Sequence, residues 1–144
     1  MIMPFMKEHA YEILSRNLEE EDITVGEFEE YVKTWHDGGP AYTIFFDGKP
    51  AFCTGVVLLD WNRGEVWLLT SSVFYSHIKS SFKIMKKLLT DTIKERGLKR
   101  VQALVDPKTK GGVSLVEHLG FQREGILRAY GPRSEDLIMF GRIT

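Results

Sequence analysis

The chain has 144 residues, of which 43% are hydrophobic and 27% charged, a composition typical of a globular protein with its own core. Its net charge of -1 provides no global field that would recruit nucleic acid or an anionic membrane. The longest aliphatic run, Val56 to Leu59, is far too short to span a bilayer, and Met1 to Phe5 shows no signal-peptide pattern. The single cysteine, Cys53, cannot form an internal disulfide, which agrees with a reducing compartment such as the cytoplasm. The length of the chain predicts one domain over residues 1–144.

Two helices are predicted at the N-terminal end of the chain. The first covers Pro4 to Asn17, where apolar residues recur at helical spacing. The second begins at a capping box of Thr24 and Glu27 and ends before Gly38. Its apolar face consists of Phe28, Tyr31, Val32 and Trp35. The acidic run between the two helices, Glu19 to Asp22, is interpreted as a solvated connection because adjacent carboxylates on a loop lack the convergent geometry of a metal site.

The pattern then changes to that of β-strands. Strands are predicted at Ala41 to Phe46, Ala51 to Leu59 and Glu65 to Thr70, and glycine-containing turns separate them. The middle segment is apolar on both faces, which indicates a strand inside a sheet. These residues predict an antiparallel meander of three strands.

The second half of the chain alternates helices and strands. An apolar stripe from Ile78 to Ile93 predicts a third helix that ends at Gly97, and the strand Lys99 to Val105 follows. Because this helix connects two strands, we expect the strands to pair in parallel. A short helix over Val113 to Leu119 is closed by Gly120. Two further strands are predicted at the end, at Phe121 to Leu127 and Leu137 to Ile143.

The segment Leu115 to Arg128 contains the motif Leu-Gly-Phe-x-x-Glu-Gly-x-x-Arg, in which x is any residue. This segment resembles the C-terminal portion of GNAT-type (Gcn5-related) N-acetyltransferases. The resemblance covers Ala41 to Ile143 in the order of elements and Leu98 to Arg128 in motif detail, and a few N-terminal residues are similar to GNAT-like proteins from phages. It implies an α/β (α+β) fold: a mixed, mostly antiparallel sheet with a parallel, splayed pair in the middle and about four flanking helices.

The resemblance also implies a site. In this family acetyl-CoA lies between the splayed strands, and an amine attacks its thioester. The pantetheine arm is then expected along Leu69, Thr70 and Ser71, and the diphosphate near Lys79, Ser80 and Ser81, at a helix N-terminus that favours anions. The cofactor is acetyl-CoA as co-substrate, with no metal, and the acceptor is a small-molecule or peptide amine.

Two catalytic residues are predicted by the same resemblance. Glu65 is the candidate base, because it begins the strand that borders the cleft, and Tyr130 is a candidate acid for the departing thiolate, with Ser114 or water as alternatives. The sequence departs from the family pattern at two places. The diphosphate loop expected within Ser76 to Lys83 contains no glycine, and valine occupies position 116, where relatives often have a catalytic tyrosine.

Other interpretations of the same residues stay open. The lysines of the third helix are more typical of a solvated face than of phosphate binding, and Glu65 is more typical of an exposed strand end than of a base. Aromatic residues such as Trp61, Trp67 and Tyr130 more often pack than line an acceptor pocket. Three functions follow, in this order: an acetyl-CoA-dependent N-acetyltransferase, a catalytically inactive GNAT-like binding or structural module, and a nucleic-acid binder that uses those lysines. A homodimer is compatible with each.

Overall fold

The computed structural model describes residues 1–17 and 28–144. Within them the chain forms seven strands and five helices. The strands are β1 (Ile2–Pro4), β2 (Ala41–Phe46), β3 (Lys49–Leu58), β4 (Arg63–Thr70), β5 (Arg100–Val105), β6 (Gln122–Leu127) and β7 (Leu137–Ile143). The helices are α1 (Lys7–Asn17), α2 (Glu29–Asp37), α3 (Ser72–Ser76), α4 (Ile78–Arg96) and α5 (Gly112–His118).

All the strands form one sheet, in the order β1-β2-β3-β4-β5-β7-β6. Neighbouring strands are antiparallel except β4 and β5, which are parallel because the long helix α4 connects them. Gly97 ends α4 in the left-handed conformation, with a φ of 62°, so that the chain can return to the sheet. This architecture confirms the predicted fold class, including the meander and the parallel pair in the middle.

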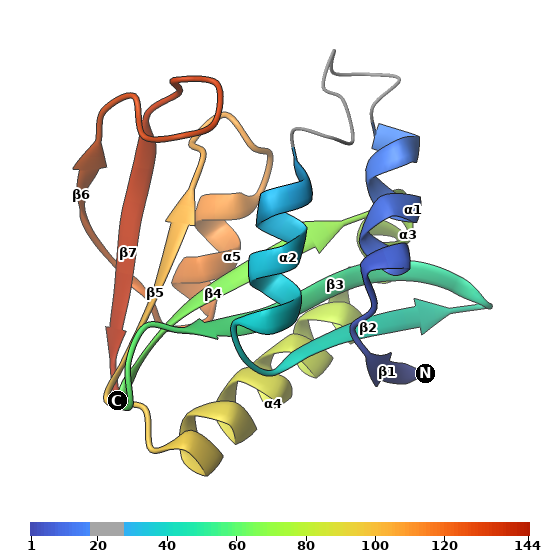
Figure 1. The fold of residues 1–144 in the computed structure, drawn as a ribbon, viewed down its shortest axis with the longest axis horizontal. Helices are drawn as coiled ribbons and strands as arrows, with labels where there is room; N and C mark the ends of the chain where they lie inside the picture. The colour runs from blue at the N-terminus through green and yellow to red at the C-terminus, as the bar shows by residue number, and fades with distance from the viewer. Residues whose placement is uncertain (18–27) are drawn as a thin grey trace.

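Helices cover both faces of the sheet, with α1 and α2 on one face and α3, α4 and α5 on the other (Figure 1). Each face has its own core. Under α1 and α2 the buried side chains include Ile13, Val32 and Trp67, whereas Met85 and Phe140 belong to the core on the α4 face. Side chains alternate along a strand, so β4 contributes to both cores.

Two elements differ from the prediction. Pro4 does not begin the first helix but ends β1, an edge strand in which it lies opposite Tyr42 of β2. Proline is tolerated there because an edge strand has one side without ladder hydrogen bonds. The five-residue helix α3 was not predicted, since it is too short to show a period. The capping box at Thr24 and the acidic run from Glu19 lie outside the described residues.

The remaining helices and strands lie where they were expected, within a few residues at each end. Cys53 is buried in the core beneath α1 and α2. None of the helices in the described part of the chain is both long and apolar enough to cross a membrane.

Candidate functional site

The parallel strands β4 and β5 pair over only three residues each and then separate. Their register joins Arg63–Glu65 to Arg100–Gln102, and Glu65 is the last residue of β4 with a partner on β5. Beyond it the two strands diverge, as Figure 1 shows for the green β4 and the orange β5. The sheet therefore contains a V-shaped opening whose vertex lies at Glu65.

A cavity of about 520 Å³ lies on the α4 face of this opening. Its walls come from β4, from α3 and the beginning of α4, and from the loop before α5 together with α5 itself. They include the apolar side chains Leu68, Phe74, Ile78, Phe82 and Leu115. The charged lining residues are Lys79 and Lys110. A long apolar arm that carries anionic groups at one end fits such a chamber.

Strand geometry determines which residues of β4 take part. The amide of Ser71 donates to the carbonyl of Ala51 on β3, 2.9 Å away. Because successive residues of a strand direct their N–H and C=O groups to opposite sides, every second residue before Ser71 also directs these groups to β3. The backbone of Leu68 consequently points to the β5 side. Leu68 and Thr70 line the cavity, whereas the side chain of Leu69 packs into the core on the opposite face. Of the predicted trio, Thr70 alone lines the chamber.

The N-terminus of α4 forms one wall. Ser81 donates its amide to the carbonyl of His77 at 2.8 Å, the first helical hydrogen bond, so the amides of Ile78, Lys79 and Ser80 precede the helical ladder. Lys79 lines the cavity and is exposed, and Ser80 is exposed next to it. Ser81 is fully buried, and its hydroxyl bonds to the carbonyl of Phe74 rather than facing the chamber.

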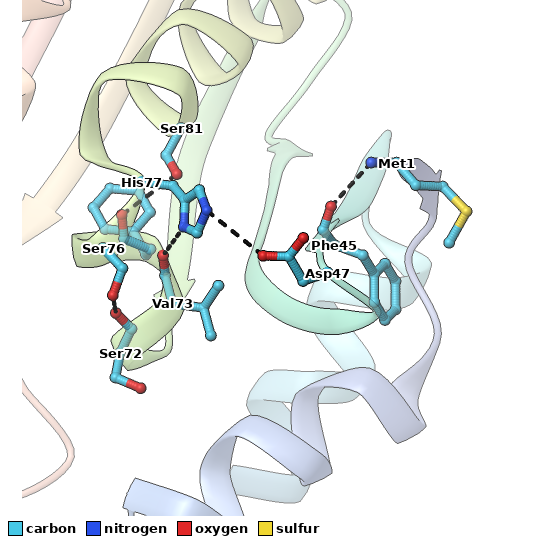
Figure 2. Close-up of polar contacts among 9 residues, drawn as sticks. Met1, Phe45, Asp47, Ser72, Val73, Ser76, His77 and Ser81 are labelled. Atoms are coloured by element: carbon cyan, nitrogen blue, oxygen red, sulfur yellow. Dashed lines mark hydrogen bonds and ion pairs between the residues drawn. The ribbon is translucent and has the colours of Figure 1, made fainter.

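His77 fixes the junction between α3 and α4. Its ring stacks on Phe46 with centroids 4.5 Å apart. Its Nε2 faces the carboxylate of Asp47, as Figure 2 shows, at a distance of 4.0 Å. Nδ1 lies 3.3 Å from the carbonyl oxygen of Val73 in the preceding helix. These contacts hold the first turn of α4 against the β2–β3 turn, so the amides at its start have a fixed direction.

A second, smaller pocket of about 250 Å³ lies on the other face of the sheet. Glu65 and Trp67 of β4 form part of its wall together with Val57 of β3. The facing side of α2 supplies Glu30, Tyr31, Thr34 and Trp35. Consecutive residues of β4 thus line two chambers on opposite faces of the sheet, next to the vertex of the V.

A chain of hydrogen bonds holds Glu65. Gln102 donates from Nε2 to Oε1 of Glu65 at 3.1 Å, and its own Oε1 accepts from Nε of Arg100 at 3.3 Å. Arg100 in turn binds Glu124 of β6 through both terminal nitrogens, at 2.8 and 2.6 Å. This bidentate hydrogen bonding lowers the pKa of Glu124 below its ordinary value and raises that of Arg100.

Gly141 of β7 lies beneath this chain. A Cβ at this position would collide with the carboxylate of Glu124 and with the guanidinium of Arg100. The absence of a side chain therefore lets the ion pair cross over β7, from β5 to the edge strand. The orientation of Glu65 is tied in this way to residues on three other strands.

Sequence reasoning missed several lining residues of the larger cavity, among them Phe74, Tyr75, Lys110, Gly111 and Gly112. The glycine pair was the available signal. The expected diphosphate loop, Ser76 to Lys83, contains no glycine, but Gly111 and Gly112 lie in another wall of the cavity, where Gly111 adopts a φ of 76°. Sequence alone could not place them across the cavity from Lys79.

The other predicted residues are dispersed. Tyr130 lies on the exposed loop between β6 and β7 and lines neither chamber. Ser114, on α5, lines the larger cavity, and Val116 is buried in the core. Trp67 lines the smaller pocket, while Trp61 is 79% exposed on the β3–β4 turn.

Comparison with solved structures identifies the fold of this architecture. A GNAT family acetyltransferase from Elizabethkingia anophelis, solved with acetyl-CoA bound, superposes with a TM-score of 0.74 at 14% identity, over 100% of this chain and 97% of that one. The chain has the GNAT fold. A spermidine N-acetyltransferase from Vibrio cholerae shows the same GNAT fold with a TM-score of 0.74 at 14% identity, covering 99% of this chain and 94% of that one.

A ribosomal-protein alanine acetyltransferase from Vibrio fischeri shares this GNAT fold with a TM-score of 0.75 and 16% identity, over 99% of this chain and 91% of that one. No protein-family model and no curated protein sequence matches the chain. The likeness is therefore one of GNAT architecture, at identities where side chains at the site are free to differ. Within residues 1–17 and 28–144, no three His, Cys, Asp or Glu side chains are grouped so as to hold a metal ion.

Proposed function

We propose that the protein is an N-acetyltransferase that transfers the acetyl group of acetyl-CoA to an amine. The observation that carries the proposal is the opening between β4 and β5, with an apolar, lysine-rimmed cavity on one face and a carboxylate-lined pocket on the other. Solved structures with this fold include an acetyl-CoA complex and a spermidine N-acetyltransferase. The two chambers suit the two substrates of such a reaction.

Acetyl-CoA binds in the larger cavity. The pantetheine arm runs along the β5-facing side of β4 at Leu68 and Thr70, where strand backbone can pair with its amides. The diphosphate lies at the start of α4, near the amides of Lys79 and Ser80, since a helix N-terminus favours an anion. Lys79 and Lys110 supply positive charge at the rim. Ser81 contributes by anchoring the helix rather than by contact, because both of its polar groups are bonded within the protein.

The acceptor enters from the α2 face and meets the thioester at the vertex. Glu65, either directly or through a water molecule, takes a proton from the ammonium group, and the neutral amine attacks the thioester carbonyl carbon. A new C–N bond forms, the C–S bond breaks, and the electron pair leaves with sulfur as the CoA thiolate. One proton goes to the thiolate and one to solvent, so the products are the acetamide and free CoA.

The group proposed to protonate the thiolate is Ser114, because of its position in the larger cavity. Ser114 lines the acetyl-CoA cavity and carries a hydroxyl, which supports it over Tyr130 as the proton donor. The role of Tyr130 stays a prediction, as do cytoplasmic location, homodimer formation and the assignment of residues 1–144 to one acetyltransferase domain.

Thermal unfolding with and without acetyl-CoA tests the first half of the proposal. At about 100 times its Kd, acetyl-CoA adds about 2.7 kcal/mol to the free energy of unfolding. No shift at millimolar acetyl-CoA would contradict the proposal. A shift without acetyl transfer to any amine would favour the inactive binding module instead.

Release of CoA, detected with a thiol reagent, tests the second half. Burial raises the pKa of the Cys53 thiol to about 11, so this thiol stays protonated and inaccessible in the folded enzyme and adds no background. In this assay Glu65→Gln is expected to lower kcat by roughly 100-fold, because it removes the base. The affinity for acetyl-CoA is expected to stay the same, since the Glu65 side chain lies on the opposite face.

A pair of lysine variants tests the position of the diphosphate. Lys79→Glu is expected to weaken acetyl-CoA binding by roughly tenfold, because it places a negative charge beside the phosphates. Lys83→Glu is the matched control: it lies one turn further along α4, is exposed, and does not line the cavity. Equal effects of both variants would mean that the lysines act only through the general charge of the helix.

A further inference from the structure

The pocket on the α2 face has walls of a particular chemistry. Trp35 stacks on Trp67 with ring centroids 4.6 Å apart and an interplanar angle of 9°. Tyr31 lies beside Trp35 at 6.4 Å, one turn earlier on the same helix, and is 42% exposed. Aromatic faces of this kind attract cations through their negative quadrupole.

Both charged residues that line this pocket are acidic, Glu30 and Glu65, and no Lys or Arg of the described residues lines it. Glu65 is held by the neutral amide of Gln102, so its charge is not compensated there. The Glu30 side chain has no ion-pair or hydrogen-bond partner among the described residues.

The carboxylates of Glu65 and Glu30 lie on different elements of the pocket wall. Glu65 is at the vertex of the V, where the thioester is expected, and Glu30 is on α2, in the first turn of the helix that covers the pocket. The structure thus provides one negative charge for a reacting ammonium group and a second for another part of the same molecule. Four neighbouring positions of α2, residues 30, 31, 34 and 35, present the second charge together with the aromatic rings.

We infer that the acceptor is an aliphatic amine with a second positive charge, bound with its reacting ammonium at Glu65 and its other cationic group between Glu30 and the aromatic rings of Tyr31 and Trp35. This inference rests on the proposed function. It predicts discrimination by charge: an amine with a neutral tail loses the contacts at Glu30, and one with an anionic tail is repelled by it.

Three acceptors of similar length separate these cases: 1,4-diaminobutane, butylamine and 4-aminobutyrate. The expected kcat/KM for the diamine exceeds that for butylamine by about tenfold, well beyond the factor of about two that its two equivalent amines provide. The expected value for 4-aminobutyrate is below that for butylamine. Equal values for the diamine and butylamine, after that factor, would overturn the inference.

Glu30→Gln tests the assigned contact. It is expected to reduce the preference for the diamine to about the statistical factor, because kcat/KM for the diamine falls much more than kcat/KM for butylamine. Glu29→Gln is the matched control, because Glu29 is the preceding residue of α2, is exposed, and does not line the pocket. If the diamine preference survives Glu30→Gln, the second charge is bound elsewhere and the inference is wrong.

A binding measurement makes the inference independent of turnover. Of the three tryptophans, two line the pocket, and Trp61→Phe removes the exposed one, so the remaining emission comes from Trp35 and Trp67. Titration with 1,4-diaminobutane is expected to change this emission at concentrations where butylamine does not, and Glu30→Gln is expected to abolish the difference. Absence of charge-dependent binding would refute the inference even where acetyl-CoA binds and amines are acetylated. Failure of the acetyl-CoA shift, by contrast, would refute the proposed function and with it the role of the diamine as acceptor, but not its charge-dependent binding at this pocket.

Discussion

The two faces of β4 differ in charge although they belong to one strand. On the α4 face, Leu68 and Thr70 border an apolar chamber with lysines at its rim, and on the α2 face Glu65 and Trp67 border an aromatic, acidic pocket. Alternation of side chains along the strand produces this difference within six residues. A strand at an opening in a sheet can therefore present opposite chemistry to two substrates.

The two chambers also differ in how they are built. The larger one is bounded mainly by the ends of helices and by a glycine-containing loop, which place backbone groups near a ligand. The smaller one is bounded by side chains that project from within α2, β3 and β4 rather than by the ends of helices or by a loop. Changes in side chains should affect the α2 face most, and changes in backbone conformation should affect the α4 face most.

The largest expected effect is on the α2 face. Trp67→Ala removes a ring that is 9% exposed and packs on both Phe5 and Trp35, so it is expected to lower the free energy of unfolding by about 3–5 kcal/mol, measured by urea denaturation. Trp61→Ala, at an exposed position, is expected to change it by less than about 0.5 kcal/mol.

Trp67→Phe adds a milder step to this series. The indole N–H of Trp67 has no hydrogen-bond partner among the described residues, so the phenylalanine variant loses packing but no hydrogen bond. Its destabilisation is expected to be smaller than that of the alanine variant. Equal losses for the two variants would show that the ring does not support this face by packing.

A glycine pair tests the α4 face. Gly111 and Gly48 have φ values of 76° and 74°, and a Cβ at either meets no atom within 4 Å. Alanine at either position is therefore expected to cost about 1 kcal/mol of stability through backbone strain alone. Gly111 lines the cavity proposed for acetyl-CoA and Gly48 does not, so only Gly111→Ala is expected to weaken acetyl-CoA binding, measured by calorimetry.

The smallest expected effect concerns the ion pair that supports Glu65. The pKa of Glu124 is lowered chiefly by its hydrogen bonds to Arg100, so the pair contributes stability above the ordinary pKa of a glutamate, and this contribution is lost as the pH falls through the lowered value. Because both side chains are partly exposed, the contribution is less than about 1 kcal/mol. Glu124→Gln is expected to be slightly less stable at pH 7 and to lose less stability below about pH 4. Equal acid sensitivity of the two proteins in denaturant titrations would show that the pair adds nothing.

The fold could be predicted from sequence because its signals are local. Apolar periods marked α1, α2 and α4, and glycine turns separated the strands of the meander. The motif from Leu119 to Gly125 resembles GNAT proteins, and the architecture agrees. β1 and α3 could not be predicted, because three and five residues are too few to show a period.

The candidate site was less predictable, because it depends on contacts between segments far apart in the chain. Thr70, Lys79 and Glu65 do line the two chambers. The alternation of side chains along β4 places Leu69 on the other face of the sheet from Thr70. Ser81 does not line the cavity, because its amide is already part of the helical hydrogen bonding of α4. Glu30 carries no motif, and its importance arises only from the packing of α2 over β4.

Gln102 has a consequence for any attempt to rebuild this pocket elsewhere. An amide has a donor end and an acceptor end, and Arg100 decides which end of Gln102 meets Glu65. Arg100 is itself anchored on the far side of a strand that has glycine at the crossing point. The orientation of the Gln102 amide at the proposed reaction centre thus depends on contacts at the edge of the sheet. If β4 and α2 alone were transferred into another protein, they would reproduce the lining of the pocket but not the orientation of Glu65. That orientation would require β5, β7 and β6 as well.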